Sequence, residues 1–128
     1  MPEEYHGPSK RKKNRSGAPR KKLSDKKLSM VGGHFTATKV GEEVVSKTRR
    51  TRGGGTKNTL KKAVFANVVD SGKVKKAKIK TVLESPQNRH HARENIITKG
   101  TIIDTELGKA RVTNRVGQDG VVHAVLVK

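Results

Sequence analysis

The sequence contains no cysteine and very few aromatic residues. Its 128 residues include no Cys, no Trp, one Tyr and two Phe. Without thiols, a disulfide framework, a thiolate metal site and a cysteine nucleophile are all excluded, and nothing indicates an oxidising compartment. Aromatic rings are too scarce for the stacking platforms on which modules that read single-stranded RNA depend. Base stacking is therefore not the expected mode of binding.

Long apolar segments are also missing. No run of about 18 apolar residues is present that could cross a bilayer. The opening stretch "MPEEYHGPSKRKK" lacks the apolar centre of a secretory signal. We therefore expect a cytoplasmic protein with no membrane partner and no small-molecule substrate.

Acidic residues are scarce relative to basic ones. The chain has 30 Lys and Arg against 11 Asp and Glu, which gives a formal net charge of +19. A merely solvated surface mixes both signs, whereas an excess of this size calls for a polyanionic partner. The composition predicts binding to nucleic acid, chiefly through phosphate contacts, with the shape of the nucleic acid providing discrimination.

The charge is concentrated in the first half of the chain. Residues 1–62 hold 18 Lys and Arg and 5 acids, a net +13, whereas residues 63–128 hold 12 and 6, a net +6. Apolar residues follow the opposite trend. We expect a basic extension over residues 1–34 that is partly disordered without its partner, followed by a β-rich domain over 35–128. Three consecutive glycines predict a flexible basic loop at 47–62 within that domain.

Short alternating segments predict the strands. A hairpin with its turn at Gly41 is expected within residues 35–45. A second hairpin is expected from two strands, 63–69 and 74–83, joined by a turn at 70–72. In its second strand, Ala77, Ile79, Thr81 and Leu83 recur with period two on one face, while Lys76, Lys78 and Lys80 line the other.

One short helix is expected over residues 86–94, with Ser85 as its N-cap and Pro86 at its first position. Further strands are expected within 95–104, 109–115 and 120–128, separated by turns at 106–108 and 117–120. The predicted fold is mainly β, with a small barrel-like body, because closure of a sheet hides its edges.

Neither a metal site nor a catalytic centre is expected. Adjacent histidines on a helix, such as His90 and His91, point about 100° apart, and no other residue completes a ligand set. Three carboxylates, Asp104, Glu106 and Asp119, lie at or beside predicted turns, where acids are common for local reasons. We expect no cofactor and no enzymatic activity.

Several segments resemble a known family. The stretches "NIITKG", "ARVTNR" and "GQDGVV" in residues 72–128, with "YHGPSKRKK" and "RTRGGGTK" earlier, are similar to the eight-e family of small-subunit ribosomal proteins of archaea and eukaryotes. The chain departs from that family at Tyr5, where members often have Trp, and at "KKLSMVGG". Its length resembles the archaeal form. The resemblance implies a barrel-like body and a basic extension that bind small-subunit ribosomal RNA (rRNA) beside neighbouring ribosomal proteins.

Charge and resemblance together predict the residues that contact rRNA. The positions that match the family's basic segments are Lys10, Arg11, Lys12, Lys13, Arg50, Arg52, Lys57, Lys73, Lys75, Lys76 and Lys99. The remaining predicted contacts follow from the basic runs alone and are Arg15, Arg20, Lys21, Lys22, Lys26, Lys27, Arg49, Lys61 and Lys62.

Other interpretations stay open at this point. The sequence Arg52 to Gly54 fits a lone RGG element and a plain linker equally well. A chromatin-like protein that compacts DNA would carry a similar basic arm. An RNA-modifying enzyme is a third possibility, although no nucleotide-binding pattern is visible.

Overall fold

The computed structural model describes residues 13, 15–18, 31–51 and 53–127. The chain divides into two units, residues 1–35 and 36–128, and each is described by itself. In the first unit, residues 15–17 form a turn in which Gly17 has a φ of +79°. The disorder expected for the basic extension falls mostly on residues outside the described part of the chain.

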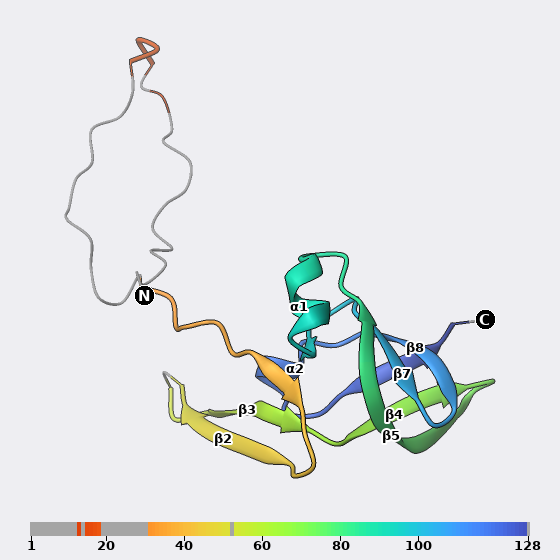
Figure 1. Ribbon diagram of the computed structural model, residues 1–128. Helices are drawn as coiled ribbons and strands as arrows, with labels where there is room; N and C mark the ends of the chain where they lie inside the picture. The colour runs from red at the N-terminus through yellow and green to blue at the C-terminus, as the bar shows by residue number, and fades with distance from the viewer. Residues whose placement is uncertain (1–12, 14, 19–30, 52, 128) are drawn as a thin grey trace. The chain divides into compact units, whose positions relative to one another are not determined.

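The second unit consists mainly of strands, as the sequence predicts (Figure 1). Its elements in chain order are β1 (Thr38–Val40), β2 (Val45–Arg50), β3 (Thr56–Ala63), β4 (Phe65–Asp70), β5 (Lys73–Glu84), α1 (Arg89–Arg93), β6 (Ile96–Ile97), β7 (Ile102–Thr105), β8 (Gly108–Val112), α2 (Val116–Asp119) and β9 (His123–Leu126).

Five strands form the predicted barrel. Strands β4, β5, β7, β8 and β9 follow one another around a closed barrel, and each consecutive pair is antiparallel. A parallel pairing of β4 with β9, in which Val68 lies opposite Ala124, closes the ring. Closure leaves no free edge in this sheet, so none of its strands can pair with another chain.

The barrel interior is filled by small and β-branched side chains. Alternate residues of each strand point inward, as period-two geometry requires. The inward residues, all at most 3% exposed, are Ala66, Val68, Ala77, Ile79, Ile103, Ala110, Val112 and Ala124. Alanine at four of these positions suits the narrow lumen of a five-stranded barrel, where larger side chains would collide.

Strand β5 departs from the predicted period. Ala77 and Ile79 are buried, but Thr81 and Leu83, which the alternation places on the same face, are exposed, and Val82 is buried instead. The register between β5 and β7 shifts between Ile79 and Thr81. Such a bulge adds one residue to the strand and turns the following side chains to the other face.

A second sheet lies beside the barrel and corrects the first predicted hairpin. Its strand order is β2-β3-β1-β6, with β1 parallel to β3. The two strands flanking Gly41 are therefore not paired with each other, because β3 lies between them. The amide of Gly41 instead donates to the carbonyl of Ala63 at 3.0 Å, and the Thr38 hydroxyl donates to the carbonyl of Leu60.

The prediction of a flexible loop at 47–62 is also wrong, because most of this segment forms strands. Strands β2 and β3 form an antiparallel ribbon from the pair Ser46 and Leu60 to the pair Arg50 and Thr56. The glycines form only its tip, where Gly54 has a φ of +84°, a conformation that other residues rarely adopt.

The helices differ from the prediction in position and number. Helix α1 starts at Arg89, because the Asn88 side chain, rather than that of Ser85, caps it by accepting from the amide of His90 at 3.0 Å. A second helix, α2, occupies the predicted turn at 117–120 and ends at Gly120, whose φ is +74°. The turns predicted at 70–72 and 106–108 are confirmed.

Candidate nucleic-acid interface

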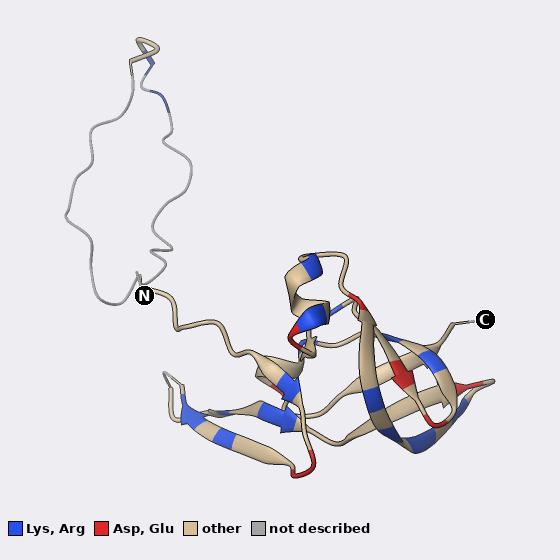
Figure 2. Ribbon diagram, in the orientation of Figure 1, with Lys and Arg blue, Asp and Glu red and all other residues tan. Residues whose placement is uncertain are grey.

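Lys and Arg residues recur along the strands and helix of the second unit, and Asp and Glu residues are fewer (Figure 2). Of the described Lys and Arg residues, only Lys75 forms an ion pair with a carboxylate, 3.6 Å from its Nζ to Asp70 Oδ2. That pair is exposed, and exposed pairs contribute about 0–1 kcal/mol. The positive charge of the body is therefore available to an external anion.

The ribbon of β2 and β3 concentrates part of this charge. Lys47 and Arg49 alternate along β2, Lys57 lies on β3, and Lys61 is the unpaired residue of a bulge in β3, between Leu60 and Lys62. Arg49 lies directly opposite Lys57 in the register, so their side chains share one face of the ribbon. Like charges in directly opposite positions destabilise a sheet. We call Lys47, Arg49, Lys57 and Lys61 the ribbon cations; all are exposed.

The other face of the ribbon is supported from within the protein. The Thr48 hydroxyl donates to Asn58 Oδ1 at 2.9 Å across the two strands. Helix α2 packs closely on the same strand: a Cβ added at Gly120 would lie 2.8 Å from that of Asn58. The ribbon is therefore held on the face that carries Asn58, and three of the ribbon cations, Lys47, Arg49 and Lys57, occupy the opposite face.

A second group of cations lies on the outer wall of the barrel. Lys76, Lys78 and Lys80 are exposed at alternate positions of β5, as predicted. The ammonium of Lys76 lies over the ring of Phe65 on the neighbouring strand. Lys73 and Lys75 continue the basic character toward the turn between β4 and β5.

A third group surrounds α1. Arg89 and Arg93 are exposed on this helix, which has no acid in its first turn. The Gln87 side chain donates to the carbonyl of Lys99 at 3.3 Å, which joins the turn carrying Lys99 to the segment that precedes the helix. The described residues contain no group of three or more His, Cys, Asp or Glu that could hold a metal ion.

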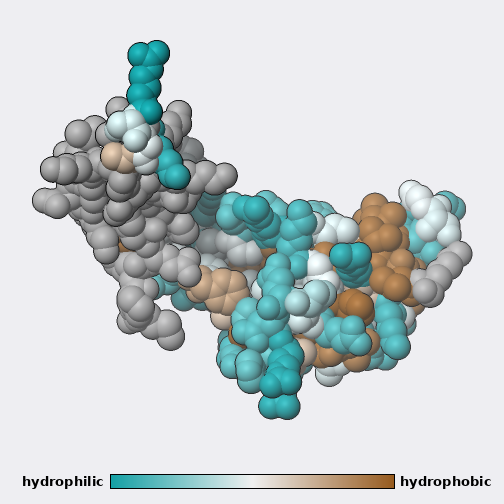
Figure 3. Space-filling model, turned by 90° about the horizontal axis from the view of Figure 1, so that it is seen from above, coloured by the Kyte–Doolittle hydropathy of each residue, from teal (hydrophilic) through white to brown (hydrophobic). Residues whose placement is uncertain are grey.

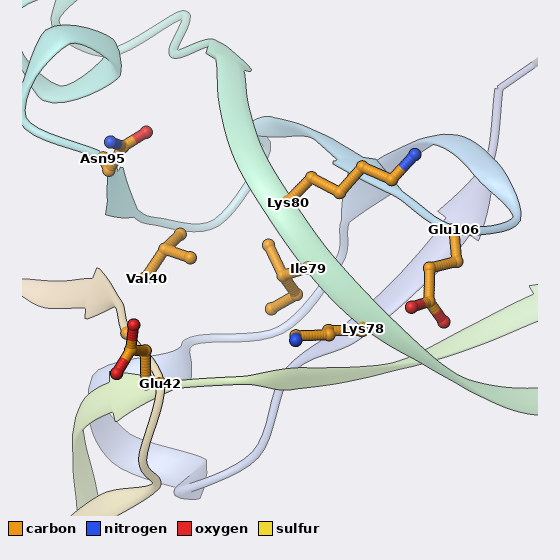
Figure 4. A pocket seen from close by; sticks show the side chains of 8 residues that line it. Val40, Glu42, Lys78, Ile79, Lys80, Asn95 and Glu106 are labelled. Atoms are coloured by element: carbon orange, nitrogen blue, oxygen red, sulfur yellow. The ribbon is translucent and has the colours of Figure 1, made fainter.

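A cavity of about 570 Å³ lies between β1 and β5 (Figure 4). Its lining includes Lys78 and Lys80 of β5, with Glu42 and Glu106 flanking that strand. The lining thus combines two carboxylates with two ammonium groups.

The structure places eleven of the predicted contact residues and leaves nine undescribed. Those outside the described residues are Lys10, Arg11, Lys12, Arg20, Lys21, Lys22, Lys26, Lys27 and Arg52. Lys13 and Arg15 belong to the first unit and are exposed. The rest lie exposed on the second unit, in the three groups just described or at the ends of β2 and β3: Arg49, Arg50, Lys57, Lys61, Lys62, Lys73, Lys75, Lys76 and Lys99.

Several other exposed cations of the second unit were not among the predicted contacts. They are Lys39, Lys47, Lys78, Lys80, Arg89, Arg93, Lys109, Arg111 and Arg115. The alternation of β5 already indicated Lys78 and Lys80, which lie on the same predicted face as Lys76. Lys47 already began the predicted basic loop, but that it shares a face with Arg49 follows from strand β2, which the sequence did not predict.

Among the described residues, no helix is both long and apolar enough to traverse a bilayer. A barrel with an adjoining basic ribbon and few acidic partners defines a small, basic, mainly β protein of the kind that suits a polyanion. Comparison with known protein families gives a match over nearly the whole chain: the family described as "Ribosomal protein S8e" matches residues 7–127. The chain belongs to this family.

Three curated relatives have similar sequences over nearly the whole chain. Each is named "Small ribosomal subunit protein eS8". The protein from Hyperthermus butylicus is 46% identical over 97% of this chain and 92% of its own length. Those from Sulfolobus acidocaldarius and Ignicoccus hospitalis are 45% and 47% identical, each over 97% of this chain, and 97% and 96% of their own lengths.

Proposed function

We propose that this chain is a structural constituent of the small ribosomal subunit that binds rRNA through phosphate contacts and shape, without catalytic activity. Family membership supports the assignment of the chain to the small ribosomal subunit. The cations of the body that form no ion pair support binding through phosphate contacts. In this role the protein acts in the cytoplasm, contributes to subunit assembly and translation, and lies beside other small-subunit proteins.

The observation that carries the mode of binding is the ribbon. Three cations, Lys47, Arg49 and Lys57, share one face of a two-stranded element, two of them directly opposite, and Lys61 lies exposed at the bulge beside them, with no acid to compensate the four charges. Phosphates spaced along an RNA backbone would relieve this repulsion and release counterions into solution. The basic extension over residues 1–34, which holds Lys10 to Lys13, would add further phosphate contacts.

Sedimentation tests whether the chain is part of the small ribosomal subunit. A tagged chain expressed in an archaeal host should migrate in a sucrose gradient with small subunits at high magnesium. Recovery only in the free fraction, or with nucleoids, contradicts the assignment. Purified chain should also prefer small-subunit rRNA to genomic duplex at equal salt, whereas a chromatin-like protein would show the opposite order. Turnover of an RNA substrate by the purified chain would indicate a modifying enzyme.

Salt dependence tests the ribbon itself. Replacing the four ribbon cations by Gln should reduce the slope of log affinity against log salt by about 3 to 4, because each released counterion contributes about 0.7–0.9. The matched control replaces Glu42 and Glu43, exposed in the connection between β1 and β2, by Gln. An unchanged slope in the ribbon variant contradicts its contact with phosphate.

A further inference from the structure

A row of valines, three of them exposed and Val69 half-buried, lies on the outer wall of the barrel. Val69 of β4 is the register partner of both Val74 of β5 and Val125 of β9, so these three side chains are successive neighbours across three strands. Val127 lies two residues beyond Val125 on the same side of the chain. Val74 is 67% exposed, Val125 44% and Val127 46%. We call these four residues the valine row.

The valine row contrasts with the other outward positions of the same strands. On β5 the next outward residues are Lys76 and Lys78, and on β8 they are Lys109 and Arg111. Single exposed apolar residues are common, but contiguous ones mark an interaction surface. Figure 3 shows apolar side chains gathered at the end of the body that carries the C terminus.

Cations border the valine row on both sides. Arg111 is the register partner of Val125, and the carbonyl of Lys109 accepts from the amide of Val127 at 2.9 Å. On the other side, Lys76 follows Val74 along the outward face of β5. None of these three cations forms an ion pair with an acid. The surface is thus an apolar centre with a positive rim.

We propose that the valine row docks an apolar segment of another protein of the same particle, and that acidic residues flank this segment. The inference rests on the proposed function and names one of its partner surfaces. Apolar side chains of the partner would cover the valines, and its carboxylates would pair with Lys76 and Arg111.

Other occupants fit this surface less well. RNA presents phosphates, sugars and flat bases, which are bound by cations and aromatic rings rather than by aliphatic side chains. Covering the valines with RNA would remove water from polar groups without replacing their hydrogen bonds. A second copy of this chain would bring two positive rims together, and the chain's own basic segment at 10–27 would meet the same repulsion.

Photo-crosslinking in intact particles tests the proposal. A photoreactive amino acid is placed at position 74 in one chain and at position 78 in another, and small subunits containing each are isolated and irradiated. Position 74 should give an adduct with a different protein, mapped to an apolar segment flanked by Asp or Glu. Position 78 should give an adduct with rRNA. At position 74, an adduct with rRNA, with a second copy of this chain or with a segment lacking acids overturns the docking proposal. Absence of an adduct there also overturns it.

The two proposals fail in distinguishable ways. If the chain does not sediment with small subunits, both are wrong; if it does and only position 78 reacts, docking alone is wrong. A second measurement adds Val125→Glu to the chain that carries the photoreactive residue at 74, and this should lower the yield of the protein adduct about tenfold. The control is Val121→Glu, an exposed valine outside the valine row, which should leave that yield unchanged. Equal yields in both variants overturn the proposal.

Discussion

The ammonium nitrogen of Lys76 lies 4.4 Å from the centre of the Phe65 ring. The two residues are diagonal neighbours on β4 and β5, because Phe65 is paired with Lys78 and Lys76 is paired with Asn67. A cation above an aromatic face is stabilised by the ring quadrupole, by about 0.5–1 kcal/mol at an exposed site. The contact also covers a ring that is 44% exposed.

The contact should be measurable as a coupling free energy. In a double-mutant cycle with Phe65→Leu and Lys76→Gln, the two changes should be non-additive by about 0.5–1 kcal/mol in the free energy of unfolding in urea. The same cycle with Lys80, which has no ring contact in the described structure, should be additive. Additivity in both cycles would show that the Lys76 contact contributes nothing to stability.

The ribbon pair predicts opposite effects on stability and on binding. Arg49→Gln removes one of two like charges that lie directly opposite, so the free protein should become more stable by a few tenths of a kcal/mol. The same change should weaken rRNA binding and lower the salt slope by about one. Thermal unfolding and filter binding measure the two effects, and Glu43→Gln serves as the charge control. A loss of both stability and affinity contradicts the role assigned to Arg49.

The tight packing of α2 on β3 predicts a large effect at one glycine. Gly120→Ala places a Cβ 2.8 Å from that of Asn58 and also forces a φ of +74° on alanine. Gly72→Ala is the matched control, because its φ is +84° but no other atom lies within 4 Å of the new Cβ. The control should lose about 1–2 kcal/mol of unfolding free energy from backbone strain alone. Gly120→Ala should lose clearly more, and equal losses would exclude the steric contact.

The start of α1 gives a prediction that separates the two candidate caps. Asn88→Ala removes the side chain that accepts from the His90 amide, so it should cost about 0.5–2 kcal/mol of unfolding free energy. Ser85 Oγ is buried and makes no hydrogen bond with the described residues, so Ser85→Ala should be neutral or slightly stabilising. Chemical denaturation measures both losses of unfolding free energy. A larger loss for Ser85→Ala than for Asn88→Ala would identify Ser85 as the cap.

The barrel could be predicted because its signals are local. Alternation in β4, β8 and β9, and turn residues such as Gly72 between them, depend on neighbours in the sequence. The second sheet could not be predicted, because β1 pairs with β3 rather than with β2, the next strand in the sequence, and nothing near Gly41 reveals that partner. Similarly, the bulge in β5 after Ile79 arises from its pairing with β7, not from its own residues.

The candidate site was predictable in kind but not in layout. Net charge and the scarcity of acids indicated a polyanion, and the basic runs identified many of the cations. Which cations share a face depends on strand register, as the opposition of Arg49 and Lys57 illustrates. The valine row had no sequence signal of its own, because Val69, Val74 and Val125 come from three strands and are adjacent only across the sheet.

The parallel pairing of β4 with β9 has a consequence for synthesis of the protein. Val68 and Ala124 lie 56 positions apart in the sequence, yet their strands must meet before the barrel is complete. During translation, β4 emerges from the exit tunnel long before β9 and waits with an unsatisfied edge. Cotranslational folding can therefore yield only an open sheet, and truncated nascent chains that end before residue 123 should be the form most prone to aggregate or to need a chaperone.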